Sequence, residues 1–172
     1  MQSTVFLAFA LSQFAALACA NEPPNPNIDY SGFVTEAARL EPLREQNRLS
    51  EAEFIHIAAT PRTIILDARS ADRFNQLHIK GAVHLALTDF TADALAKLIP
   101  DKSTRILIYC NNNFAGEPVN FAAKMAPVAL NIQTFINLHA YGYDNVMELG
   151  PVLDVNTTKI PFAGESVTTN PR

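Results

Sequence analysis

The chain has 172 residues, of which 48% are hydrophobic and 17% are charged, and its formal net charge is −4 at pH 7. The part that follows the N-terminal apolar segment, about 150 residues, fits one domain with a full hydrophobic core. The sequence contains no basic run, so nucleic acid and anionic membrane surfaces are not expected as partners.

Residues 1–20 have the features of a secretory signal peptide. They carry no charge, are mostly apolar and end in Ala18-Cys19-Ala20, a cleavage signal that polar, proline-rich residues 21–26 follow. The apolar stretch is too short and too interrupted for a transmembrane helix. One feature of a signal peptide is missing, because no Lys or Arg precedes the apolar residues. We therefore expect an exported protein, periplasmic or secreted and soluble after cleavage; a lipoprotein modified at Cys19 is the alternative. Cleavage would leave Cys110 as the single cysteine, which cannot form an internal disulfide.

Helical and extended patterns alternate along the rest of the chain. Residues 63–67 and 105–109 are continuous apolar runs typical of strands buried on both faces, and shorter strands are predicted at 81–85 and 146–149. Ser50 and Glu53 form a capping box that opens a helix ending near residue 59. Further helices are predicted at residues 33–48 with a break near Pro42, 70–77, 91–99, 118–125 and 134–142. This alternation indicates an α/β fold with a largely parallel sheet.

Cys110 stands out because it ends one of these strands. Ligand sites in parallel α/β folds lie at the carboxyl ends of strands, and Asp67 ends another strand. A polar loop follows the cysteine, and Pro118 suits the first turn of the helix predicted after it. We therefore expect backbone N–H groups of the loop and of that helix to surround the thiol, lower its pKa and stabilise a thiolate or a bound anion. A buried, inert cysteine is the other interpretation.

Three segments together resemble the rhodanese-like domain, a single-domain sulfurtransferase family. The first segment combines Leu66-Asp67-Ala68-Arg69-Ser70 with His78-Ile79-Lys80-Gly81-Ala82, the second is the strand that ends at Cys110, and the third is Gly142-Tyr143-Asp144-Asn145-Val146. The resemblance implies a mostly parallel sheet of about five strands with helices on both faces. The resemblance places the rhodanese-like domain at residues 49–154. With the expected signal peptide (1–20), the remaining parts are a linker and N-terminal helical extension (21–48) and a polar C-terminal tail (155–172).

The resemblance also implies the chemistry of the site. Cys110 would be the catalytic residue, carrying sulfane sulfur as a persulfide between a small sulfur donor and a thiol acceptor or a partner protein. Asp67 and Arg69 would support the site structurally. The substrate would lie against the loop, whose residues are Asn111, Asn112, Asn113, Phe114, Ala115 and Gly116. No cofactor or metal is expected, because His56, His84 and His139 lack the spacing of metal ligands.

The loop departs from the usual pattern of the family. Many catalytic members have Arg or Lys in this loop, whereas residues 111–116 contain no cation, so inefficient use of thiosulfate is expected. Extra residues are expected near 126–136, where they and Phe114 would shape or cover the pocket.

Two rival functions follow from the same pattern. A phosphatase or arsenate reductase would need a longer loop closed by an Arg, but position 116 is Gly and residues 111–127 contain no Arg. A non-catalytic binding module, which recognises a partner through the same cleft, is consistent with the cation-free loop and the charged N-terminal helix.

Overall fold

The computed structural model describes residues 25–169, so the expected signal peptide at 1–20 lies outside the described residues. The chain divides into two units, residues 1–30 and 31–172. In the described part of the first unit, the Asn27 N–H donates to the side chain of Asn25 (3.0 Å). Among residues 25–169 no helix has the length and apolar character needed to cross a bilayer.

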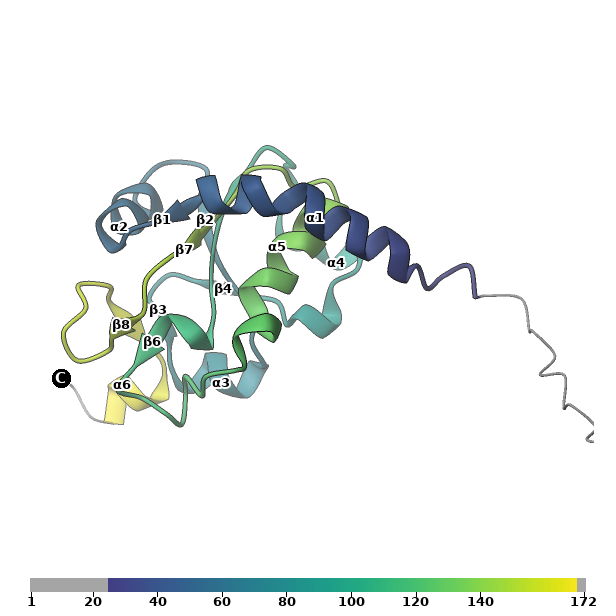
Figure 1. The fold of residues 1–172 in the computed structure, drawn as a ribbon. Helices are drawn as coiled ribbons and strands as arrows, with labels where there is room; N and C mark the ends of the chain where they lie inside the picture. Colours follow the sequence, from purple (N-terminus) through teal and green to yellow (C-terminus); the bar gives the residue numbers. More distant parts are fainter. Residues whose placement is uncertain (1–24, 170–172) are drawn as a thin grey trace, which may run out of the picture. The chain divides into compact units, whose positions relative to one another are not determined.

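A five-stranded parallel sheet forms the centre of the second unit (Figure 1). Its strand order is β1-β7-β5-β2-β4. The strands are β1 (Arg48–Leu49), β2 (Thr63–Asp67), β4 (Val83–His84), β5 (Arg105–Tyr109) and β7 (Val146–Leu149). All pairings are parallel, with Asp67 opposite Tyr109 and Ile108 opposite Glu148. The predicted sheet is therefore confirmed, and Asp67 and Cys110 end strands at the same edge.

Successive side chains of each strand point to opposite faces of the sheet, so both faces carry apolar side chains. Helices cover both of these faces. On one face, Leu66, Ile106 and Ile108 pack with residues of α1 (Tyr30–Gln46), α4 (Ala92–Leu98) and α5 (Leu130–Ala140). On the other, Ile65, Leu107 and Tyr109 pack with residues of or beside α2 (Glu51–Ala58), α3 (Ala71–Gln76) and α6 (Glu165–Thr169). Residues 25–169 also contain three short 3₁₀ turns, η1 (Leu87–Asp89), η2 (Asn111–Asn113) and η3 (Ala126–Val128).

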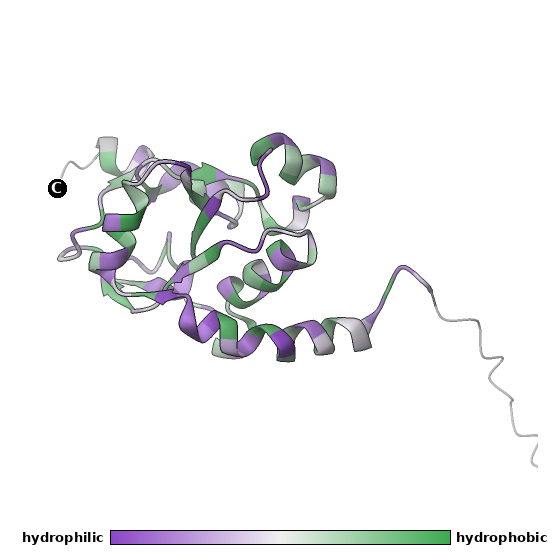
Figure 2. Cartoon of the chain, turned by 90° about the horizontal axis from the view of Figure 1, so that it is seen from above, coloured by the Kyte–Doolittle hydropathy of each residue, from purple (hydrophilic) through white to green (hydrophobic). Residues whose placement is uncertain are grey.

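Local capping agrees with two of the predicted helix starts. The Ser50 side chain accepts from the Glu53 N–H and the Glu53 carboxylate accepts from the Ser50 N–H, which completes the capping box of α2. Thr91 caps α4 through the Ala94 N–H (3.1 Å). The break expected near Pro42 is absent, since α1 continues through the proline and buries Leu40 two residues before it. Polar and apolar residues alternate along α1 (Figure 2).

The segment between η2 and α5 differs from the prediction. The helix expected at 118–125 is absent, and residues 114–129 form β6 (Phe114–Ala115), turns and η3. Eight residues between two prolines make a short helix, which is unstable unless other contacts support it. α5 begins at Leu130, four residues earlier than predicted, so residues 130–136 belong to this helix and the irregular segment lies before it.

Residues 155–169 pack on the domain, in contrast to the polar tail that the sequence pattern favoured. Val155 and Ile160 are buried in the second core cluster. β9 (Phe162–Ala163) pairs antiparallel with β3 (His78–Ile79), and β8 (Leu153–Asp154) pairs with β6. The apolar residues are too widely spaced among polar ones to form a periodic pattern, which explains why the sequence alone did not predict these elements.

Candidate active site

Cys110 lies directly after β5, at the carboxyl edge of the sheet, and only 2% of its surface is exposed. Backbone N–H groups of Asn131, Asn112 and Leu130 form hydrogen bonds to its thiol. Two of these groups belong to the first turn of α5. The expected helix N-terminus therefore adjoins the cysteine, but α5 provides it instead of a helix beginning at Pro118.

Burial raises the pKa of the Cys110 thiol. Hydrogen bonds from the Asn131 and Asn112 N–H groups act in the opposite direction, and the negative charge of Glu148 adds to the rise. The prediction of a lowered pKa was wrong, because removing the thiol from water outweighs the donors around it. Glu148 is itself buried on β7, and burial also raises its pKa, although its carboxylate pairs with Arg44 (2.8 Å) and Arg48 (3.5 Å).

Asn113 fixes the chain around the cysteine. Its side-chain oxygen accepts from the Cys110 N–H (2.8 Å) and from the Asn131 amide (3.1 Å). Its amide group donates to the carbonyl oxygens of Leu149 (2.7 Å) and Pro151 (3.2 Å). Asn113 is 5% exposed, so it acts as an internal clamp and does not line a surface that a substrate can reach.

Asn111 and Asn112 bind the segment 114–129 where it folds back toward the cysteine. The Asn111 amide donates to the Ala122 carbonyl oxygen (2.8 Å). The Asn112 side chain donates to the Lys124 carbonyl oxygen and accepts from the Lys124 N–H, both at 2.8 Å. The substrate was expected to lie against these residues, but the side chains of Asn111 and Asn112 are engaged with the protein backbone.

Asp67 and Arg69 form a buried ion pair, which agrees with a supporting role for both. The guanidinium contacts both carboxylate oxygens, with the shortest distance at 2.6 Å, and donates to the carbonyl oxygens of Leu77 (2.7 Å) and Asn120 (3.0 Å). It also lies over the ring of Phe121, 4.5 Å from the centroid. Arg69 thereby connects the end of β2 to the segment 114–129.

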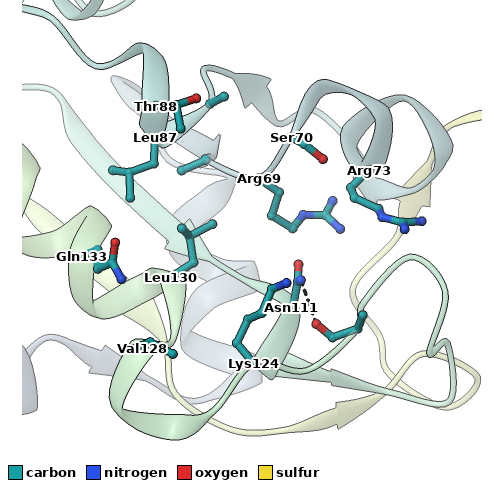
Figure 3. Close-up of a pocket in the computed structure, with 13 residues that line it drawn as sticks. Arg69, Ser70, Arg73, Leu87, Thr88, Asn111, Lys124, Val128, Leu130 and Gln133 are labelled. Atoms are coloured by element: carbon teal, nitrogen blue, oxygen red, sulfur yellow. Dashed lines mark hydrogen bonds between the residues drawn. The ribbon is translucent and has the colours of Figure 1, made fainter.

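A pocket of about 460 Å³ opens between the ends of β2 and β5, the segment 114–129 and the start of α5 (Figure 3). Of the predicted loop residues, only Asn111 lines it. Its charged lining residues are Arg69, Arg73 and Lys124, and no carboxylate is among the lining residues. Arg73 lies on α3, four residues after Arg69. Lys124 could not be assigned to the site from the sequence, because it comes from a distant segment that no motif marks.

A second pocket, of about 650 Å³, lies on the other side of the same loop, where Asn112, Phe114, Ala115 and Gly116 line it together with Val152. The Phe114 ring packs against Phe121 (4.6 Å between centroids), so its role is to build the core beneath the segment. Within residues 25–169, no group of three or more His, Cys, Asp or Glu side chains has the arrangement of a metal site.

The family model of the rhodanese-like domain matches residues 50–149. A solution structure of the rhodanese-like domain from the Anabaena sp. Alr3790 protein is 21% identical, with a TM-score of 0.50, and the match covers 73% of this chain and 85% of that one. EanB in complex with hercynine is 19% identical, with a TM-score of 0.52 over 69% of this chain and 27% of EanB. A further EanB structure, whose ergothioneine is covalently linked with a cysteine persulfide, is 19% identical with a TM-score of 0.51 over 69% of this chain and 28% of EanB.

At these identities the likeness to the solved structures shows the shared fold alone. A search of the curated proteins finds no match. The family model, however, covers more than half of the chain and includes both the Asp67–Arg69 pair and Cys110. The chain belongs to the rhodanese-like domain family.

Proposed function

We propose that this protein is a sulfurtransferase that carries sulfane sulfur as a persulfide on Cys110. The observation that carries the proposal is the position of the thiol at the end of β5, where it accepts hydrogen bonds from the backbone N–H groups of Asn112, Leu130 and Asn131. These donors, two of them at the start of a helix, are suited to hold the negative charge of a persulfide. The cysteine persulfide in the EanB complex with ergothioneine supports the same chemistry on this fold.

The reaction consists of two displacements at sulfur. The Cys110 thiol first loses its proton to solvent, and the thiolate attacks the outer sulfur of the donor. A new S–S bond forms, the donor's S–S bond breaks, and the electron pair leaves with the rest of the donor. An acceptor thiolate then attacks the outer sulfur of the persulfide, and the electron pair of the broken bond returns to Cys110. No net oxidant or reductant is needed.

Access to the thiol requires a local movement of the residues around it, because Cys110 is 2% exposed. The segment 114–129 is held in place by the Asn111 and Asn112 side chains and by Arg69, which donates to the Asn120 carbonyl oxygen. The proposal therefore includes a local opening before each transfer step.

The test is a direct measurement of the persulfide. The full chain is treated with thiosulfate and with an organic persulfide, and peptide mapping by mass spectrometry separates Cys110 from Cys19, the other cysteine. We expect one added sulfur atom on the Cys110 peptide, its loss on addition of a thiol acceptor, and neither event in Cys110→Ser. If no donor yields a persulfide on the Cys110 peptide, the sulfurtransferase proposal is wrong.

A binding module is the second candidate, and the exposed apolar side chains of the segment 114–129 favour it. Val119, Met125 and Val128 on this segment are 61%, 77% and 53% exposed, and Val152 beside it is 68% exposed. Exposed apolar side chains that gather around a site are typical of a surface that binds a partner. A protein that binds its partner equally well with Cys110→Ser, and forms no persulfide, would establish this function instead.

A further inference from the structure

The pocket beside Cys110 carries an unbalanced positive charge. Arg69 is neutralised by the carboxylate of Asp67. Arg73 donates to the neutral amide of Gln76 (3.2 Å), and Lys124 forms no ion pair with any residue in the described range 25–169. Because no carboxylate lines the pocket, an anion that enters it is attracted by Arg73 and Lys124 and is not repelled by a negative side chain of the lining.

Lys124 is held at this pocket by a specific backbone contact. Asn112 binds both the N–H and the carbonyl oxygen of Lys124, at 2.8 Å each, and this two-point contact fixes where the side chain leaves the main chain. Asn111 fixes the same segment two residues earlier, through the carbonyl oxygen of Ala122. In Figure 3 the lysine side chain extends into the pocket beside Asn111.

We propose that Lys124 is the specificity-determining cation of this site, that Asn112 is its positioning residue, and that the preferred donor is an organic persulfide bearing a carboxylate. This inference rests on the proposed sulfur transfer. The cation that the loop 111–116 lacks would thus be provided by the segment 114–129. The expectation of a neutral site holds only for residues adjacent to Cys110 in the sequence.

The pocket's size and lining indicate an organic donor. Its volume of about 460 Å³ far exceeds that of a small inorganic anion and lies in the range of organic ligands. Leu87, Val128 and Leu130 provide apolar surface for the carbon skeleton, while Ser70, Thr88 and Gln133 provide polar groups. Leu130 lines the pocket and also donates its N–H to the Cys110 thiol. A donor that fills the pocket therefore contacts a residue that is hydrogen-bonded to the thiol.

The transfer balances with this donor. The Cys110 thiolate attacks the outer sulfur, the bond between the two donor sulfurs breaks, and the electron pair leaves on the inner sulfur as a thiolate. The donor's carboxylate takes no part in bond making, and it remains paired with the Lys124 ammonium through both ground state and transition state. Its loss should therefore raise KM and leave kcat unchanged.

The experiment compares two probes that differ only in charge, the persulfides of 3-mercaptopropionic acid and of 3-mercaptopropionamide. Their reaction with the protein is followed as persulfide on the Cys110 peptide. We expect the wild type to react with the acid about tenfold more efficiently than with the amide, because a single charge-assisted contact is worth a factor of this order. Lys124→Gln should remove this preference through KM, Lys124→Arg should retain most of it, and Asn112→Ala should reduce it. Lys97→Gln, at an exposed lysine of α4 outside the pocket, is the matched control and should behave as the wild type.

Binding separates this inference from the proposed function. In Cys110→Ser, the symmetrical disulfides of the same acid and amide serve as non-transferable probes, and Lys124→Gln is added to that background. The inference is overturned if the acid and the amide bind alike, or if Lys124→Gln weakens both equally. A protein that forms the persulfide but shows no acid preference keeps its proposed function and loses this donor specificity. A protein that prefers the acid in binding but never forms a persulfide has the anion site without sulfur transfer.

Discussion

Replacing Asn113 with alanine is expected to destabilise the protein more than any other asparagine substitution in the loop. The side chain makes four hydrogen bonds in the interior, to the Cys110 N–H, the Asn131 amide, and the carbonyl oxygens of Leu149 and Pro151. Alanine would leave these four groups without their partner, and a net cost of about 1 kcal/mol per bond, discounted for the longest contact, amounts to about 3 kcal/mol.

Urea denaturation measures this loss. With a slope of about 2 kcal/mol per M for a domain of this size, the midpoint should fall by about 1.5 M. Asn145→Ala is the control, because the Asn145 amide makes a single long bond near the surface, to the Ser103 carbonyl oxygen at 3.3 Å, and its removal should cost less than about 0.5 kcal/mol. A loss below about 1 kcal/mol for Asn113→Ala, or equal losses for the two variants, would refute the role of Asn113 as an internal clamp.

Three further predictions concern the thiol and the glycines. Glu148→Gln removes a charge that raises the pKa of Cys110, so the rate of thiol alkylation should rise at lower pH than in the wild type, and an unchanged pH profile would show that this charge does not act on the thiol. Because the folded-state pKa of Cys110 is raised, the stabilising effect of its neutral form is complete below the ordinary thiol pKa of about 8.5 and is lost as pH rises through the folded-state value. The Tm of the wild type should therefore fall relative to that of Cys110→Ser above about pH 8.5, and parallel curves would contradict this. Gly164→Ala should cost about 2–3 kcal/mol, since φ is +121° and a Cβ would lie 2.6 Å from the Gln76 carbonyl oxygen, whereas Gly81→Ala, at φ +86° with open space around it, should cost about 1 kcal/mol; equal urea midpoints would contradict the difference.

The sheet and the edge at which Asp67 and Cys110 lie could be predicted, because the sequence patterns that mark them are local. Buried parallel strands are continuous apolar runs, so β2 and β5 are evident in the sequence, and with them the positions of Asp67 and Cys110. The capping box at Ser50 fixes the start of α2 in the same way. The family resemblance led us to expect structural support from Asp67 and Arg69, but it did not predict the ion pair that joins them.

The cover of the site depends on contacts between distant residues, which no local pattern contains. Pro118 is acceptable as the first residue of a helix, but Asn111 and Asn112 bind backbone groups 11 and 12 residues further along and hold the segment as a loop. The burial of Cys110, which sets the direction of its pKa shift, is likewise a property of the tertiary structure that no local pattern contains. Lys124 was missed for the same reason, since only the folded segment carries it to the pocket.

The pairing of Glu148 with the N-terminal helix has a practical consequence for producing the domain on its own. A fragment trimmed to residues 50–149, the stretch that matches the family model, would discard Arg44 and leave a buried carboxylate without its nearest cation. It would also discard Leu40 and Val155, one from each core cluster. Removing one partner of a buried ion pair costs about 3–5 kcal/mol, a large part of the stability of an ordinary domain. The smallest fragment worth expressing therefore begins before α1 and ends after α6.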